Sequence, residues 1–75
     1  MKVSYDLEVD ALYIELREIA RGTAENRPLS EDITIVYGPD GRVSGIEVID
    51  ASEVLGDNLD RLTLEISTPV RPRPA

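Results

Sequence analysis

The alternation of hydrophobic and polar positions predicts short β-strands along most of this chain. In residues 11–16, leucine and isoleucine occupy every second position, which is the pattern of a half-buried strand. Residues 2–5 are also β-prone, so the two segments are predicted to pair as a hairpin through the polar residues 6–10. A helix over residues 9–20 is the alternative, because its aliphatic positions also fit a 3.6-residue period. The β-branched and aromatic content favours the strand.

A second hairpin gives the clearest local signal. Residues 33–37 and 43–49 are rich in β-branched side chains, and the turn between them contains Pro39, Asp40 and Gly41. Proline sets φ to about −65°, aspartate suits the next turn position, and glycine takes the positive φ that returns the chain to a strand. We therefore predict a β-hairpin with Gly41 at positive φ.

Both faces of this second hairpin are expected to be apolar. On one face lie Ile33, Ile35, Tyr37, Ile46 and Val48, and on the other lie Val36, Val43 and Ile49. An antiparallel sheet with one face in water shows clean apolar and polar alternation instead. The second face therefore needs a cover, and the simplest cover is an identical subunit, since two-fold dimers are the commonest closed assembly. The sequence predicts a homodimer or higher oligomer formed through the sheet.

The remaining segments are less regular. In residues 17–30, Gly22 interrupts the chain, residues 23–27 fit a short edge strand, and Pro28 confines that strand to an edge or a terminus. Further on, residues 51–55 are predicted to form a short helix.

The ends of that helix carry their own signals. Asp50 is expected to accept hydrogen bonds from the backbone of the first turn, and Gly56 is expected to provide the exit. Leucine and isoleucine then alternate with polar residues in residues 62–66, which predicts a final strand. Residues 69–75 are rich in proline and arginine and are predicted to be a disordered tail.

The composition limits both the fold and the chemistry. The chain has 75 residues, 41% of them hydrophobic and 31% charged, which is the balance of one small globular domain. We predict an α+β domain over residues 1–68, with an antiparallel sheet of four to five strands built as two hairpins and one short helix. Cysteine and histidine are absent, so the common thiolate nucleophile, the usual neutral-pH general base and the commonest zinc ligands are missing.

The charge is strongly acidic. Eight Lys and Arg against fifteen Asp and Glu give a net charge of −7. A body of this sign repels a phosphate backbone, because nucleic-acid affinity comes largely from basic side chains that displace counterions. There is no signal-peptide pattern, and no apolar run approaches the roughly 18 residues of a membrane span. The sequence therefore predicts a cytoplasmic protein.

Two blocks of the sequence resemble a known family. The first contains Tyr5, Asp6 and residues 10–16, and the second contains residues 40–43 and 45–52. Together with Tyr37, these blocks are similar to the small bacterial and archaeal family called domain of unknown function 2283, over roughly residues 1–55. In the family pattern the hairpin tip is richer in acids, whereas this chain has Gly38 and Pro39 there.

The resemblance implies neither an activity nor a substrate or cofactor. Relatives of this size are sometimes encoded beside small toxin-like proteins, so the resemblance implies an antitoxin-like binding role as one possibility.

The acidic residues are the first candidates for chemistry. Asp6, Glu8 and Asp10 lie at i, i+2 and i+4, like the first ligands of a calcium loop. An EF-hand then requires glycine and glutamate where this chain has Ala11 and Arg17. A solvated turn is the better interpretation.

Glu47 is the second acidic candidate. It lies in an apolar strand with Val43 and Ile49 at period two, and such surroundings would desolvate a carboxylate and suit it to acid–base work. The alternatives are an ion pair across the sheet with Arg42, Arg17 or Lys2, or exposure to water, and no nucleophile or oxyanion donor set accompanies Glu47 in the sequence. With Asp6 and Asp10 it defines a carboxylate-based metal-binding domain or enzyme as the alternative function; Glu15 is a further oxygen ligand for such a site.

Basic residues give a third hypothesis. Arg17, Arg21 and Arg27, with Tyr13 as a stacking partner, are the elements of a single-stranded nucleic-acid surface, although interleaved glutamates cancel most of the field. Residues 69–72 match a P-x-x-P pattern, which is common by chance.

Taken together, these observations favour a non-catalytic protein–protein interaction module. We expect it to self-associate, with an unlike protein as a further possible partner, and we assign it no catalytic, cofactor-binding or metal-binding residue.

Overall fold

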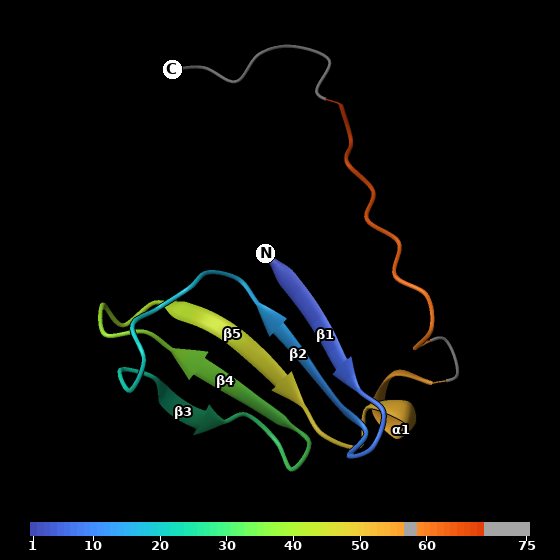
Figure 1. The fold of residues 1–75 in the computed structure, drawn as a ribbon, viewed down its shortest axis with the longest axis horizontal. Coiled ribbons are helices and arrows are strands. Elements are labelled where there is room, and N and C mark those ends of the chain that lie inside the picture. Colours follow the sequence, from blue (N-terminus) through green and yellow to red (C-terminus); the bar gives the residue numbers. More distant parts are fainter. Residues whose placement is uncertain (57–58, 69–75) are drawn as a thin grey trace.

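Five antiparallel strands and one short helix form the fold in the described residues, 1–56 and 59–68, of the computed structural model (Figure 1). The elements are β1 Lys2–Asp6, β2 Ala11–Glu15, β3 Glu25–Pro28, β4 Ile33–Tyr37, β5 Val43–Val48 and α1 Ala51–Leu55. The predicted α+β class is therefore confirmed, and the alternative helix over residues 9–20 does not form.

The strand order is β1-β2-β5-β4-β3, so β5 lies at the centre of the sheet and β1 and β3 are its edges. Hairpins join β1 to β2 and β4 to β5, but β3 also pairs with β4. The description as two hairpins is therefore not confirmed. Residues 16–24 connect β2 to the opposite edge of the sheet (Figure 1).

The turn between β4 and β5 has the expected geometry. Gly41 has a φ of 79°, and its N–H donates to the carbonyl of Gly38 at 3.0 Å. The N–H of Gly38 donates in turn to the carbonyl of Arg42 at 2.8 Å. Pro39 and Asp40 thus occupy the two central positions of a tight turn, and glycine follows them where the chain needs positive φ.

A β-bulge at the end of this hairpin changes the expected distribution of side chains. Val36 is opposite Gly45 whereas Tyr37 is opposite Val43, so Ser44 is the extra residue. Val43 consequently joins Tyr37 on one face instead of lying on the opposite face. The prediction that both faces of the hairpin are apolar is wrong, because a strict period of two does not anticipate the bulge.

The cross-strand register divides the sheet into two unlike faces, since directly opposite residues share a face. On β1, β2, β5 and β4 the apolar face consists of Val3, Tyr5, Leu12, Ile14, Ile33, Ile35, Tyr37, Val43, Ile46 and Val48. At its β3 edge it ends at two charged residues, Glu25 and Arg27. The polar face consists of Lys2, Ser4, Asp6, Ala11, Tyr13, Glu15, Thr34, Val36, Gly45 and Glu47. The polar side chains of β1, β2, β4 and β5 therefore lie mainly on one face of the sheet.

The short helix α1 begins in a way that the sequence did not predict. Asp50 has a φ of 50° and its side chain makes no capping hydrogen bond. Its backbone carbonyl instead accepts from Glu53 and Val54, at 3.0 and 3.1 Å. Gly56 ends the helix with a φ of 81°, a value that favours glycine.

Few side chains are buried in the described residues. Val36, Val48 and Ala51 are 8%, 5% and 0% exposed, and Ser44 is the one buried polar residue among them. The hydroxyl of Ser44 donates to the carbonyl of Val36 at 3.2 Å, so its burial leaves no polar atom unsatisfied. The single sheet therefore has a small core, and most of its apolar face is half-buried or exposed.

Residues 61–68 do not form the predicted final strand. They are extended and exposed, and in the described part of the chain no strand pairs with them. A β-strand needs a hydrogen-bonded neighbour as well as an alternating sequence, and here the neighbour is missing. The predicted tail, residues 69–75, and its P-x-x-P match lie outside the described residues.

Candidate functional site

Asp10 joins the β1–β2 turn to α1. The Tyr5 hydroxyl donates to Asp10 Oδ1 at 2.5 Å, and the Ser52 N–H donates to the same oxygen at 3.0 Å. The Ser52 hydroxyl donates to Oδ2 at 2.6 Å, and the Ala51 N–H donates to the Asp10 carbonyl at 2.9 Å. Asp10 therefore caps the helix from 42 residues away, in place of the Asp50 side chain.

These hydrogen bonds also set the ionisation of the pair. The Ser52 hydroxyl, followed by the Tyr5 hydroxyl, stabilises the carboxylate and lowers the pKa of Asp10. The same bond to Asp10 raises the pKa of Tyr5, because the phenol must keep its proton to donate. With both oxygens already accepting from protein donors, Asp10 has a structural role and is a poor metal ligand.

The other carboxylates considered for a metal or an active site do not join Asp10. Asp6 and Glu47 lie on the polar face, and Asp6 Oδ1 accepts from the backbone N–H of Glu8 at 3.0 Å within the turn. The described residues contain no group of three or more Asp, Glu, His or Cys that could hold a metal ion. Asp6, Glu8 and Asp10, which have the calcium-loop spacing, thus lie in and beside the β1–β2 turn.

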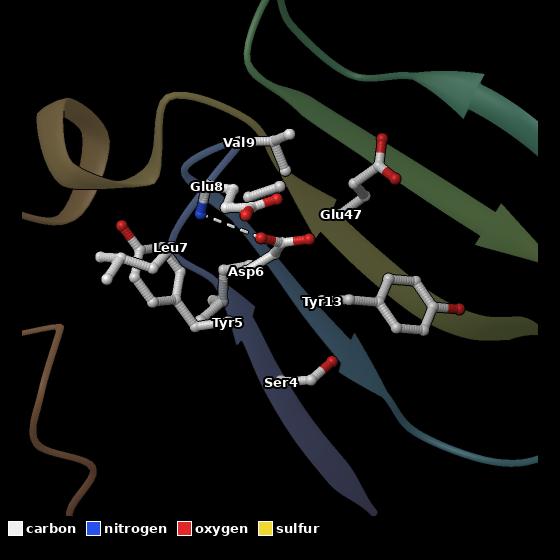
Figure 2. A pocket seen from close by; sticks show the side chains of 10 residues that line it. Ser4, Tyr5, Asp6, Leu7, Glu8, Val9, Tyr13 and Glu47 are labelled. Atoms are coloured by element: carbon white, nitrogen blue, oxygen red, sulfur yellow. Dashed lines mark hydrogen bonds between the residues drawn. The ribbon is translucent and has the colours of Figure 1, made fainter.

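An open hollow of about 570 Å³ lies on the polar face beside the β1–β2 turn. Figure 2 shows Ser4, Asp6, Tyr13 and Glu47 around it, with the turn at one end. The Tyr13 ring covers Gly45 so closely that a Cβ there would collide with the ring. Gly45 is therefore a packing glycine, which gives an aromatic side chain room on the neighbouring strand.

The surroundings of Glu47 differ from those expected. Its cross-strand neighbours are Tyr13 and Thr34, and its side chain is exposed. Val43 is displaced to the apolar face by the bulge, and Ile49 lies beyond the end of β5. The apolar environment on which the acid–base hypothesis for Glu47 depended is therefore absent.

The arginines make local structural contacts. The Arg17 guanidinium bonds Asp40 Oδ1 at 2.5 Å and the Arg42 carbonyl at 3.0 Å, which fastens the β2–β3 connection to the β4–β5 turn. This hydrogen bond from Arg17 lowers the pKa of Asp40.

Arg27 lies elsewhere, on the edge strand β3. It pairs with Glu25 at 3.2 Å, and its guanidinium carbon lies 4.9 Å from the centre of the Tyr37 ring. Arg17 and Arg27 therefore serve different strands and do not form the basic strip with Tyr13 that the nucleic-acid hypothesis required; Arg21 is exposed in the connection between them.

The apolar face is the largest feature left without a structural explanation. Hollows of about 310 and 360 Å³ open on it. Val3 and Ile14 line both hollows, and α1 reaches the first through Leu55. The helix is thus too short to cover a face that crosses the sheet, and this face is the candidate functional surface.

The fold and this surface define a class: a small α+β domain with a single antiparallel sheet, one face of which has no covering layer among residues 1–56 and 59–68. Residues 2–52 match the family described as "Protein of unknown function (DUF2283)", and the chain belongs to that family. Comparisons with curated proteins and with solved structures found no match. Within the described residues, no helix is long and apolar enough to cross a membrane.

Sequence reasoning missed the network around Asp10. Tyr5, Asp10 and Ser52 all lie inside the two blocks that carry the family resemblance, and that is the signal that singles them out. No local pattern indicates that Asp10 and Ser52 touch, because they are 42 residues apart.

Proposed function

We propose that this protein is a non-catalytic protein–protein interaction module that binds through the apolar face of its sheet. The observation that carries the proposal is the uncovered face itself, which runs across β1, β2, β5 and β4 without a charged side chain. Contiguous apolar surface of this kind is characteristic of interaction sites in small proteins. The antitoxin-like role implied by the family resemblance is one form that such binding would take.

The polar residues support the same assignment. Asp10, Asp40 and Arg17 are engaged in contacts that hold the connections of the fold together. Glu47 and Asp6 lie on the opposite face without a third acidic partner in the described residues.

The test compares matched substitutions on the two faces. Ile46→Lys places a charge in the middle of the apolar face, and Thr34→Lys places the same charge on the polar face of the neighbouring strand. The full chain is purified alone and also co-expressed with the product of the adjacent gene, and molar mass is measured by light scattering. We expect a complex, of like or unlike chains, that Ile46→Lys abolishes and Thr34→Lys preserves.

A second variant protects the test against misfolding. Val3→Lys adds a charge at the edge of the apolar face, where the side chain is 36% exposed and the cost to folding is smaller. Circular dichroism establishes that each variant is folded. A wild-type chain that remains at 8.3 kDa in both preparations, or a complex that only Thr34→Lys disrupts, contradicts the proposal.

A further inference from the structure

The C-terminal residues 61–68, which we call the arm, have the sequence of a strand without a partner. Leu62, Leu64 and Ile66 alternate with polar residues, and they are 72%, 69% and 80% exposed. Figure 1 shows the arm leaving the α1 end of the sheet and running past the other end of β1. An extended segment that presents three large aliphatic side chains to solvent has a favourable place only against another apolar surface.

The arm begins beside the apolar face but does not fill the space next to it. The hollow of about 360 Å³ is lined by Met1, Val3 and Ile14 from the sheet and by Leu62 and Leu64 from the arm. Residue Thr63 completes that lining. In the described residues no backbone hydrogen bond joins the arm to β1. The chain therefore carries an open apolar face and an open apolar arm at the same time.

We propose that the arm of one chain packs on the apolar face of a second copy, so that two chains exchange arms about a two-fold axis. This inference rests on the proposed function and names the partner. Two-fold contacts are isologous, so a surface and a segment that complement each other within one sequence satisfy both chains at once. Each copy would then cover the other's Leu62, Leu64 and Ile66.

The size of the surfaces favours an interface that includes the arms. Five strands of about five residues, at about 4.8 Å between strands and 3.3 Å per residue, give a face of roughly 400 Å² in projection. A stable interface usually buries about 800 Å² per partner. An extended arm of eight residues is about 26 Å long, so it adds to the surface that two chains can bury.

The distribution of charge also favours a second copy. Two chains that each carry a net charge of −7 repel each other unless their acidic residues are kept apart. Asp6, Glu15 and Glu47 lie on the polar face and so point away when two apolar faces meet. Glu25, which lies opposite Tyr37 on the apolar side of the edge strand, is paired with Arg27 at 3.2 Å. The arm contributes one positive and one negative side chain, Arg61 and Glu65, and is therefore close to neutral.

The far edge of the sheet is less suited to association. The edge strand β3 is short and contains Pro28, and it carries the ion pair between Arg27 and Glu25. Proline and charged side chains are the features that prevent edge-to-edge pairing of strands. These features disfavour association through β3, at the edge of the sheet farthest from the arm.

The first experiment compares the apolar and the polar positions of the arm by substituting each set in turn. A triple variant, Leu62→Ser with Leu64→Ser and Ile66→Ser, removes its apolar side chains. The matched control, Thr63→Ala with Glu65→Gln and Ser67→Ala, changes the alternate positions. Sedimentation velocity of the full chain should show a wild-type dimer, a dissociation constant at least about tenfold higher for the triple variant, and a change within about threefold for the control.

The second experiment uses the absence of cysteine in the chain. A chain with Leu64→Cys is mixed with a chain with Ile14→Cys, and the mixture is oxidised. Exchange of arms predicts a disulfide-linked heterodimer between the two variants. When both substitutions are in one chain and the protein is dilute, an arm that docks on its own face instead gives an internal disulfide at the mass of a monomer.

The outcomes distinguish this inference from the proposed function. A dimer that Ile46→Lys abolishes but the triple arm variant leaves intact, or a disulfide that forms only within a chain, overturns the exchange of arms and retains the interaction face. A wild-type chain that stays monomeric alone and with the adjacent gene product overturns both.

Discussion

An aspartate accepts several hydrogen bonds at each end of the sheet, but the side-chain donors are neutral at one end and charged at the other. At the α1 end, Asp10 accepts from the neutral hydroxyls of Tyr5 and Ser52 and from a backbone N–H of the helix. At the hairpin end, Asp40 accepts from the charged guanidinium of Arg17 and from the backbone N–H of Arg42. One carboxylate positions a helix, and the other fastens a long connection.

The difference indicates which end is more sensitive to change. Asp10 has a φ of 53°, so its backbone as well as its side chain is constrained by the turn. The Arg17–Asp40 pair is exposed, with side chains 37% and 47% accessible, and water and salt weaken such pairs. We therefore expect the stability of the α1 end to depend mainly on Asp10. The stability of the hairpin end should depend on the Pro39-Asp40-Gly41 turn more than on the Arg17–Asp40 ion pair.

The largest effect is expected for Asp10→Ala. This change removes three hydrogen bonds to the side chain and places alanine at a positive φ, so the melting temperature should fall by roughly 10 °C. Thermal unfolding followed by circular dichroism measures the change. Asp6→Ala is the control, because it removes one exposed bond within the turn, and an equal loss for both variants would refute the special role of Asp10.

The next effect is expected at the turn of the hairpin end. Gly41→Val forces a β-branched residue to a φ of 79° and should lower the free energy of unfolding by about 1–3 kcal/mol. Gly41→Asn should cost less, since asparagine tolerates this conformation. Urea titration provides the measurement, and an unchanged midpoint for Gly41→Val would show that the turn does not constrain the hairpin.

The dependence on pH should separate the two ends. The pKa values of Asp10 and Asp40 are lowered from 3.8, so their stabilisation is present above about pH 4 and is lost as the pH falls further. The pKa of Tyr5 is raised from 10.0, so its stabilisation is present below pH 10 and is lost as the pH rises through the higher folded value. Only the α1 end should therefore respond to alkali.

Tyr5→Phe tests that assignment. The variant should lose stability near neutral pH, where the wild-type bond to Asp10 is intact, and its melting temperature should decline less steeply above pH 10. Melting curves at a series of pH values make the comparison. Parallel alkaline declines for wild type and variant would show that Tyr5 is not the group responsible.

The smallest effect is expected for the ion pair. Asp40→Asn keeps an oxygen that can accept from the backbone of Arg42 and removes the charge opposite Arg17. We expect the melting temperature to change by no more than about 4 °C, and high salt should reduce the difference between wild type and variant. A larger loss that persists in salt would mean that Arg17 acts through more than its charge.

The sequence is informative about local structure and much less about contacts between distant segments. Alternation predicted β2, and the Pro39-Asp40-Gly41 turn predicted the hairpin of β4 and β5, since both depend on neighbouring residues. The bulge at Ser44 was not predictable in this way, because it depends on the register of the partner strand. The bulge moves Val43 from the predicted opposite face to the apolar face.

The candidate surface, too, was predictable from the sequence only as far as it depends on local structure. An apolar surface in need of a partner was predicted, but its membership was partly wrong because Val43 had been assigned to the opposite face. The acidic residues could not be placed from the sequence, since whether Asp6, Asp10 and Glu47 converge is decided by tertiary structure. Alternation in residues 62–66 predicted a strand that does not form, because a strand also needs a hydrogen-bonded neighbour and local sequence does not supply one.

The small buried set of Val36, Val48 and Ala51 has a consequence for the amount of this protein that a cell retains. A domain with so small a core is expected to populate opened forms readily, and proteases cleave opened chains. A partner that binds only the folded chain stabilises it by mass action, by about 2.7 kcal/mol when its free concentration is a hundred times the dissociation constant. If the apolar face binds a partner as proposed, the steady-state level of the protein should rise and fall with the supply of that partner.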